Sequence, residues 1–207
     1  MKRLINYLKL SPLYELIFPF VQKQEVRTWE QSNRTTVTPQ LVKQQLVKKL
    51  AEKNSLQIFI ETGTYLGAMI AANKCLFKKI YTVEIDPRLY QRAKSKFSND
   101  QHIQVILGDS SVVLPKVLKK LKQPALFWLD AHYSAGITSQ GLLETPIIAE
   151  IKQILRHPIK NHLILIDDAR NFNGTHDYPT IKQLRQLLYK LNPQLKLTIK
   201  QRVIQIH

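Results

Sequence analysis

From about residue 40 onward, the hydrophobic and polar positions of this chain alternate between two periods. Short runs rich in β-branched and aromatic residues are apolar on both faces, and stretches with helical spacing lie between them. The apolar runs span 57–61, 79–85, 103–107, 125–130 and 162–167, and the helical stretches lie near 66–76, 87–98, 110–121, 145–156 and 179–191. This order predicts a parallel sheet with right-handed crossovers and helices on both faces.

The end of the chain departs from this alternation. Two further alternating runs, at 195–200 and 202–207, are separated by almost nothing. Two strands with so short a connection are typical of an antiparallel hairpin. The pattern therefore predicts an α/β fold with seven strands, mostly parallel, and a C-terminal antiparallel hairpin that closes one edge of the sheet.

The N-terminal residues form a separate region, and we divide the chain into an N-terminal helical extension (1–37) and one domain (38–207). Apolar residues recur at helical spacing in the extension, and Pro12 and Pro19 are expected to break it into short helices. Such helices could cap the core edge or contact a partner or a membrane interface. Thr38 and Pro39 are expected to open the next helix, with Thr38 as N-cap.

The composition fits one globular domain with an extension, since 44% of the 207 residues are hydrophobic. The formal net charge of +16 favours anionic partners such as nucleic acid, anionic lipid or a phosphorylated substrate, or reflects a generally basic surface. No block of five consecutive basic residues occurs, so nucleic acid is a less favoured partner.

A single cysteine, Cys75, excludes a disulfide within the chain and a cysteine metal cage. We expect this thiol to be buried in its apolar surroundings and the protein to be cytoplasmic. No apolar run reaches the length of about 18 residues that a membrane span needs, and no signal peptide is evident. The sequence leaves the oligomeric state open and allows a homo-oligomer.

The candidate chemistry lies where the predicted strands end. Ligands bind outside the carboxyl ends of the strands in an open parallel sheet. All five predicted parallel strands end in or beside acidic residues, and these would meet at one edge: Glu61, Glu84, Asp109, Asp130, and the pair Asp167 and Asp168. Such a concentration of negative charge is costly unless cations, hydroxyls or amides compensate it.

The first strand leads into the segment FIETGTYLG at 59–67, which we interpret as a nucleotide-cofactor loop. Gly63 allows a tight turn close to a ligand, and Gly67 allows close helix packing. The segment lacks the third glycine of the dinucleotide fingerprint and the Gly-Lys-Ser/Thr of the phosphate loop. Glu61 would repel a pyrophosphate but could bind an ammonium group, which favours a cationic cofactor.

Two further acids extend this site. Glu84 ends the second strand, where an acid can accept both hydroxyls of a ribose. Asp109, followed by Ser110, ends the third strand and could accept from an adenine amino group. Asp109 and Ser110 could also cap the helix that follows them, and capping and cofactor binding are compatible.

The ordered motifs ExGxxxG, VEIDP and GDS, with a fourth strand that ends in Asp, resemble the class I S-adenosylmethionine-dependent methyltransferases. The resemblance covers roughly residues 40 to 207 and implies a three-layer, Rossmann-like fold. It also implies S-adenosylmethionine as the cofactor. The residues that would contact it are Glu61, Gly63, Thr64, Gly67, Glu84, Asp109, Ser110 and Asp130.

A second layer of motifs, LDAHY at 129–133 and IDDAR at 166–170, is similar to the metal-dependent sugar O-methyltransferases of macrolide and aminocoumarin biosynthesis. The resemblance implies that Asp130, Asp167 and Asp168 hold Mg²⁺. His132 stands where that family has an Asp as general base, so His132 and Asp130 are the candidate catalytic residues. The alternatives are a turn or helix cap for the acid pair, and an orienting role for His132.

The function we expect is methyl transfer from S-adenosylmethionine to a hydroxyl of a small molecule, sugar or glycan. Two alternatives stay open: an RNA methyltransferase, suggested only by the net charge, and a non-catalytic protein that binds S-adenosylmethionine. The segments 133–141 and 171–178 are candidate substrate loops, and Arg170 could bind an anionic group or neutralise Asp168.

Overall fold

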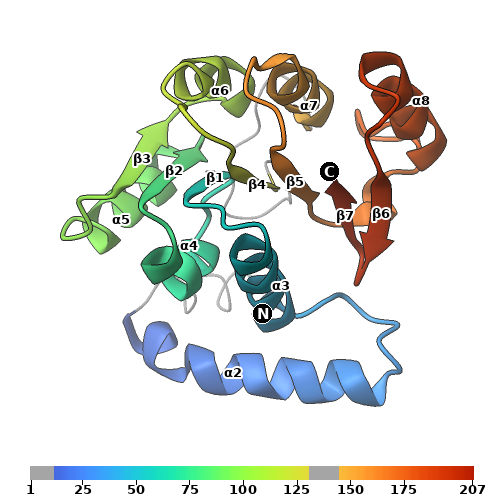
Figure 1. Cartoon of the computed structure of the whole chain (residues 1–207). Helices are drawn as coiled ribbons and strands as arrows, with labels where there is room; N and C mark the ends of the chain where they lie inside the picture. The colour runs from blue at the N-terminus through green and yellow to red at the C-terminus, as the bar shows by residue number, and fades with distance from the viewer. Residues whose placement is uncertain (1–11, 131–144) are drawn as a thin grey trace.

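The computed structural model describes residues 12–130 and 145–207 and shows one seven-stranded sheet between two layers of helices (Figure 1). The strand order is β3-β2-β1-β4-β5-β7-β6. The strands are β1 (Ile58–Thr62), β2 (Lys79–Glu84), β3 (Ile103–Leu107), β4 (Leu126–Leu129), β5 (Leu163–Ile166), β6 (Leu197–Lys200) and β7 (Val203–Ile206). The predicted fold class is confirmed, including all seven strands.

The helices divide between the two faces of the sheet (Figure 1). One layer holds α3 (Gln40–Lys53), α4 (Ala68–Asn73) with a 3₁₀ turn η1 (Lys74–Leu76), and α5 (Pro87–Lys96). The other layer holds α6 (Ser110–Leu118), α7 (Ile147–Arg156) and α8 (Ile181–Leu191), and a second 3₁₀ turn, η2 (Ala169–Asn171), follows β5. Each layer packs on its own hydrophobic core cluster, one on either side of the sheet. This explains why β1, β4 and β5 are buried along their whole length.

The four neighbouring pairs among β1 to β5 are parallel, so the carboxyl ends of these strands meet at one edge of the sheet. β7 runs antiparallel to both β5 and β6, so the turn of the hairpin lies at this same edge. The two turn residues, Gln201 and Arg202, both have positive φ, as a tight hairpin turn of the primed type requires. The Arg202 carbonyl accepts a hydrogen bond from Ala169 N at 2.8 Å, which ties the hairpin to the segment after β5.

The N-terminal extension differs from the prediction of short helices. One continuous helix, α2 (Pro12–Gln31), contains Pro19. Pro12 is its first residue, where the missing N–H has no partner to lose, and Pro19 costs one internal hydrogen bond without ending the helix. The described helices include none with the length and apolarity that crossing a bilayer requires. The division into 1–37 and 38–207 stays a prediction.

Two local predictions are wrong. Pro39, not Thr38, is the N-cap of α3, and the Thr38 hydroxyl instead donates to the Gln201 carbonyl of the hairpin turn at 2.8 Å. Cys75 is exposed rather than buried, because it lies in the 3₁₀ turn that follows the short helix α4.

Two buried histidines, His157 and His162, form a chain of hydrogen bonds at the opposite edge of the sheet. His162 Nδ1 accepts from Ala125 N at 3.0 Å, so its proton is on Nε2, which lies 3.0 Å from His157 Nδ1. The proton of His157 is therefore on Nε2 and points to the Leu118 carbonyl at 3.0 Å. Burial, His157 and Lys160 lower the pKa of His162 to about 4. These hydrogen bonds join α6, α7, β4 and β5 while the His162 ring is neutral.

We predict that the hydrogen bonds of His157 and His162 make the stability of the protein sensitive to mild acid. The unfolded pKa of a histidine is about 6.5, so the contribution of His162 is complete above that pH and is lost as the pH falls toward 4. Denaturant unfolding at pH 7.5 should therefore show wild type to be more stable than His162→Leu, and the gap should narrow at pH 5. A gap that does not change with pH would contradict this interpretation.

Candidate functional site

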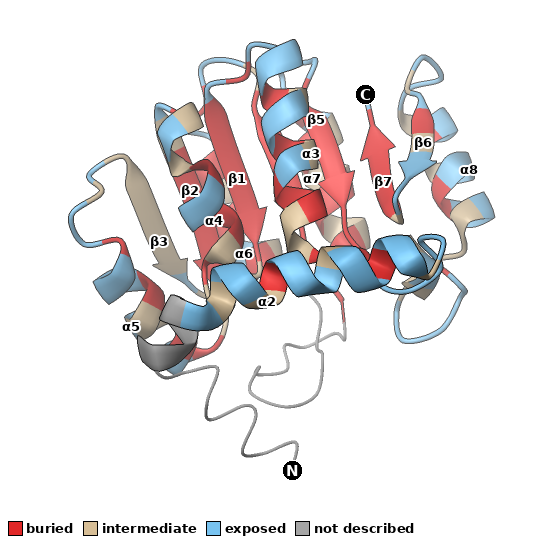
Figure 2. Cartoon of the chain, turned by 90° about the horizontal axis from the view of Figure 1, so that it is seen from below, coloured by how far each residue is buried: buried red, intermediate tan, exposed pale blue. Residues whose placement is uncertain are grey.

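A cavity of about 500 Å³ lies at the carboxyl edge of the sheet. The helix α2 crosses the strand ends at this edge (Figure 2). Its floor is the end of β1 and the loop that follows, and Trp128 and Asp130 contribute from β4. Its walls come from α2, α3, α4 and α5. The volume is typical of a small-molecule site. Four predicted cofactor residues line this cavity together: Glu61, Gly63, Thr64 and Asp130.

The loop after β1 is shaped by two glycines with positive φ. Gly63 (φ 86°) donates its N–H to the Val83 carbonyl at 2.9 Å, which turns the chain back against β2. Gly67 (φ 69°) begins α4, and a Cβ atom there would lie 2.8 and 2.9 Å from two ring carbons of Phe97. Gly67 therefore allows α4 to approach the end of α5, although it does not line the cavity.

Glu61 is a buried carboxylate, 2% exposed, that still borders the cavity. Thr82 Oγ1 donates to its Oε2 at 2.9 Å, and the Thr64 hydroxyl lies 2.6 Å from Thr82 Oγ1. Burial raises the pKa of Glu61 well above its usual value, and the nearby Asp130 and Glu84 add to this shift. A cation beside Glu61 would oppose this shift and stabilise the ionised carboxylate.

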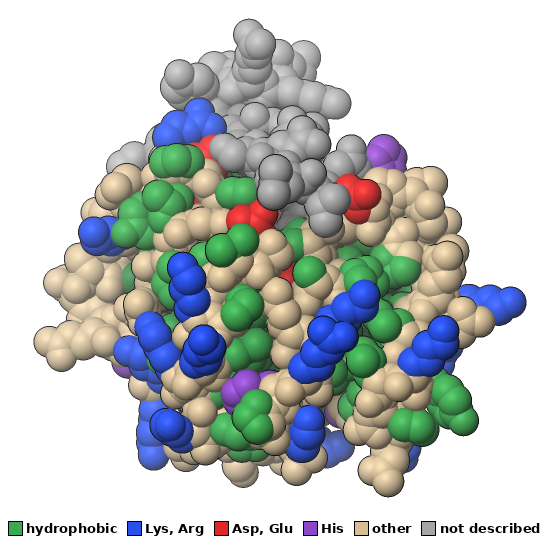
Figure 3. Space-filling model, turned by 90° about the horizontal axis from the view of Figure 1, so that it is seen from above, with side chains coloured by type: hydrophobic (Ala, Val, Ile, Leu, Met, Phe, Trp, Pro, Cys, Tyr) green, Lys and Arg blue, Asp and Glu red, His purple; other side chains and the backbone are tan. Residues whose placement is uncertain are grey.

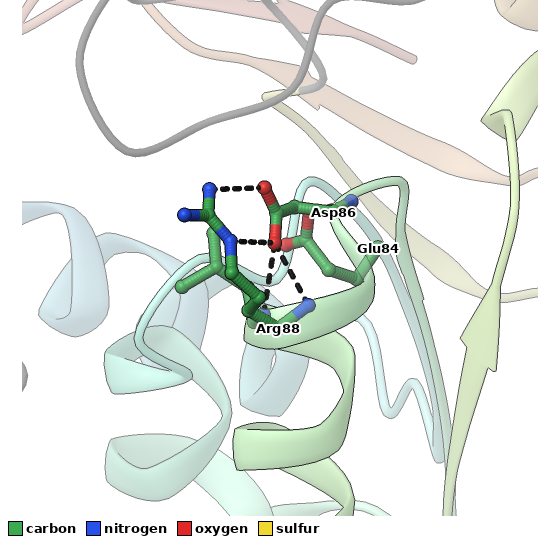
Figure 4. A network of polar contacts seen from close by, with 4 residues as sticks. Glu84, Asp86 and Arg88 are labelled. Atoms are coloured by element: carbon green, nitrogen blue, oxygen red, sulfur yellow. Dashed lines mark hydrogen bonds and ion pairs between the residues drawn. The ribbon is translucent and has the colours of Figure 1, made fainter.

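Glu84 holds the loop rather than lining the cavity. Its Oε2 accepts from Tyr65 N at 2.8 Å, and its Oε1 accepts from Asp86 N at 3.0 Å. Asp86 in turn caps α5 and accepts from the backbone N–H and the side chain of Arg88 (Figure 4). Burial raises the pKa of Glu84. The predicted ribose contact of Glu84 stays a prediction.

Asp109 is the N-cap of α6, which confirms the capping role that the sequence allowed for it. Its Oδ1 accepts from Ser111 N at 2.8 Å and from the Ser111 hydroxyl at 2.6 Å. Ser110 is buried beside Glu150 of α7. Neither Asp109 nor Ser110 lines the cavity, so their adenine contacts also stay predictions.

The acids that follow β4 and β5 surround a buried lysine of α3. Lys43 Nζ donates to Asp167 Oδ2, and both side chains are less than a tenth exposed. Burial lowers the pKa of Lys43, but Asp167, Asp130 and Asp168 together raise it by more. Burial and Asp130 raise the pKa of Asp167 to about 7, although Lys43 opposes this shift. Lys43 is thus paired with Asp167 and is stabilised electrostatically by Asp130 and Asp168.

The predicted magnesium site does not fit this arrangement well. Asp167 Oδ2 is held by Lys43, and Asp167 Oδ1 accepts from Asp168 N at 2.8 Å. Within 12–130 and 145–207, no three acidic, histidine or cysteine side chains are grouped as a metal site requires. Mg²⁺ therefore stays a prediction that the described residues do not favour. His132 and the loop 133–141 lie outside the described residues.

The segment after β5 adds a tyrosine to this side of the site. The Tyr178 hydroxyl contacts Thr145 and Asn171, and its ring packs edge-on against Phe172 with centroids 5.1 Å apart. Burial raises the pKa of Tyr178 to about 12, and Asp130 and Asp168 also raise it. The candidate substrate loop 171–178 therefore lies against the acids, whereas the Arg170 side chain is exposed.

The sequence analysis missed two buried charged residues. Lys43 is in line with the buried Val47 and Ala51 of α3, and Glu150 is in line with Ile147 and Ile154 of α7. Burial raises the pKa of Glu150 to about 7. A charged residue within an apolar helical stripe was the signal that could have identified both.

A basic surface covers the layer of α6, α7 and α8 (Figure 3). The segments 110–129 and 178–207 contain no Asp or Glu, and Glu150, the acid of α7, is buried. The exposed basic side chains of this layer include Lys116, Lys119, Lys120, Lys122, Arg156, Lys160, Lys182, Arg185 and Lys190. Much of the net positive charge is therefore on one face, next to the acidic edge.

Comparison with known proteins identifies the fold. No protein-family model matches the chain. The O-methyltransferase TomG from Streptomyces achromogenes, solved with S-adenosylmethionine, has a TM-score of 0.60 at 12% identity over 89% of this chain and 87% of its own. An O-methyltransferase from Bacillus cereus, solved with S-adenosylhomocysteine, has a TM-score of 0.61 at 12% identity over 89% of both chains. The methyltransferase PaMTH1 of Podospora anserina gives 0.57 at 18% identity, over 88% of this chain and 86% of its own.

A sequence relative adds little to this. An uncharacterized protein of Methanocaldococcus jannaschii is 30% identical over 89 residues, which cover 42% of this chain and 34% of that protein. The match thus spans about a third of the relative's length. The comparisons confirm the predicted resemblance to class I methyltransferases at the level of the fold.

We predict that Gly67→Ala destabilises the protein by about 1–3 kcal/mol, through the positive φ and the contact with Phe97. Gly174→Ala is the matched control, since its φ is also positive (91°) but its nearest contact, Thr180 Cγ2, is at 3.2 Å. Denaturant unfolding should show a larger loss for Gly67→Ala, and Phe97→Leu should reduce the excess in a double-mutant cycle. Equal losses for the two glycine variants would show that the contact with Phe97 is unimportant.

Proposed function

We propose that the chain is an S-adenosylmethionine-dependent methyltransferase. One observation carries the proposal: a buried carboxylate, Glu61, borders a small-molecule cavity beside a glycine turn at the end of β1. A carboxylate in that place suits the ammonium group of an amino-acid cofactor and disfavours a pyrophosphate. TomG and the Bacillus cereus enzyme were solved with S-adenosylmethionine and S-adenosylhomocysteine on this fold, which supports the assignment.

The acceptor we propose is a hydroxyl of a small molecule, sugar or glycan. Two observations support oxygen as the acceptor atom: several structural neighbours are O-methyltransferases, and carboxylates and hydroxyls surround the edge beyond Asp130. Asp130 borders the cavity and is electrostatically coupled to Asp167 and Lys43. It therefore lies between the cofactor cavity and the group of acids where an acceptor would bind.

The chain's own groups have four roles in this proposal. Glu61 binds the cofactor ammonium, and the turn at Gly63 and Thr64 lets the backbone approach the ligand. Asp130 orients the acceptor hydroxyl, and His132 accepts its proton, which a neutral imidazole can do near neutral pH. Bound S-adenosylmethionine supplies a methyl group on a sulfonium: the acceptor oxygen forms the new C–O bond, the C–S bond breaks, and the sulfur leaves as a neutral thioether. No step is assigned to a metal ion.

RNA as the acceptor is a second candidate, which the basic surface over α6, α7 and α8 favours. Such a surface contacts phosphates without reading sequence. This layer adjoins the acidic edge of the sheet, so a strand bound on it could reach the site.

We predict that isothermal titration calorimetry detects S-adenosylmethionine binding to the wild-type protein. Glu61→Gln should weaken it by about 10- to 100-fold, because the variant keeps an acceptor oxygen but loses the negative charge opposite the cofactor ammonium. Glu52→Gln is the matched control, since Glu52 is exposed on α3 away from the cavity. Absence of binding to wild type, or equal binding by Glu61→Gln, would contradict the proposal.

RNA as the acceptor predicts salt-sensitive binding that depends on the basic surface. Fluorescence anisotropy with a structured RNA should show that Lys119→Glu with Lys120→Glu, just after the C-terminal end of α6, weakens binding and flattens its salt dependence. The matched pair Lys48→Glu with Lys49→Glu, exposed on α3, should have little effect. Equal effects of the two pairs would indicate non-specific attraction and reject this candidate.

A further inference from the structure

The structure places a lysine where the resemblance to metal-dependent enzymes expects a metal ion. Lys43 is on α3, before the first strand and outside every motif that carried the resemblance. Its side chain is 8% exposed, and its ammonium donates to Asp167 Oδ2. An ammonium is costly to bury without a partner, so its position depends on the carboxylates it meets.

Those carboxylates are the three predicted metal ligands. Asp167, Asp130 and Asp168 all interact electrostatically with Lys43. Both oxygens of Asp167 are engaged, one by Lys43 and the other by the N–H of Asp168. A divalent cation at Asp167 Oδ2 would have to share that oxygen with the ammonium or displace it, and in either case it would meet a repelling charge a few ångströms away.

The position of Lys43 is held by its helix. The neighbouring Gln44 Nε2 donates to the Ala68 carbonyl at the start of α4 at 2.9 Å, and Gln22 of α2 donates to Gln44 Oε1 at 3.4 Å. Gln44 lines the cofactor cavity, while Lys43 faces the acids. Adjacent residues of α3 therefore serve the two halves of the site, and the ammonium is fixed relative to the cavity.

We propose that Lys43 is a positioning residue that provides, from within the fold, the positive charge that metal-dependent enzymes take from a divalent cation. The inference rests on the proposed methyltransferase function. Lys43 holds Asp167 in place and offsets the charge of the acids, so that Asp130 can orient an acceptor hydroxyl without a bound metal. The site would accordingly transfer methyl groups with no requirement for Mg²⁺.

Binding of Mn²⁺ tests this proposal without knowledge of the acceptor. Electron paramagnetic resonance measures the unbound Mn²⁺. Wild type and Asp167→Asn should bind Mn²⁺ equally weakly, because Asp167 does not hold the ion in wild type. Lys43→Met keeps the length of the side chain but not its charge, and it should bind Mn²⁺ at least about tenfold more tightly than wild type. Adding Asp167→Asn to Lys43→Met should abolish this gain.

Two controls complete the experiment. Lys43→Arg, which keeps the charge, and Lys48→Met, the same change at an exposed position of α3, should both behave as wild type. Circular dichroism establishes which variants are folded. Mn²⁺ binding by wild type that requires Asp167 would overturn the proposal even if Lys43→Met fails to fold. A folded Lys43→Met with no gain in Mn²⁺ affinity would also overturn it. Calorimetry with S-adenosylmethionine on the same samples reports separately on the proposed function.

Discussion

Carboxylates gathered at one edge of a buried sheet repel one another, and this repulsion is the constraint on which the site depends. The parallel strands bring Glu61, Glu84, Asp130 and Asp167 to the same edge, and all but Asp130 are less than a tenth exposed. The fold offsets the charge in three ways. Backbone N–H groups hold Glu84, the Thr82 hydroxyl holds Glu61, and the ammonium of Lys43 holds Asp167. The negative charge that the protein does not offset internally is available to attract a cationic ligand.

This view gives each half of the site a distinct character. The half around Glu61 has a cavity, and within the described residues the carboxylate is hydrogen-bonded to a hydroxyl rather than paired with a cation, which suits a cofactor that brings a positive charge. The half around Asp167 already contains its cation. Asp130 lies between the two and is coupled to both Glu61 and Lys43. The cofactor loses its sulfonium charge when the methyl group leaves. In this arrangement, that loss would change the electrostatic environment of Asp130 most directly.

The sequence predicted the sheet well, because runs that are apolar on both faces are typical of strands covered by helices, and such runs have few other interpretations. It also predicted the loop that lines the cavity, since Glu61 and Gly63 lie at the turn after β1, where a ligand at the carboxyl end of this strand would bind. It offered helix capping for Asp109, but it could not show that the carboxylate of Glu84 is held by backbone N–H groups, since that depends on loop conformation. It missed Lys43 because its partner, Asp167, is 124 positions away in the chain.

Crystal diffraction from protein grown with S-adenosylhomocysteine and Mn²⁺ is the most direct test of this account. Anomalous scattering locates manganese, and ordinary density locates the cofactor product and Lys43. The account predicts the amino group of the product beside Glu61 and the Lys43 ammonium on Asp167, with no manganese peak between Asp130 and Asp167. A manganese ion bound by these aspartates with Lys43 displaced, or a product bound away from Glu61, would contradict it.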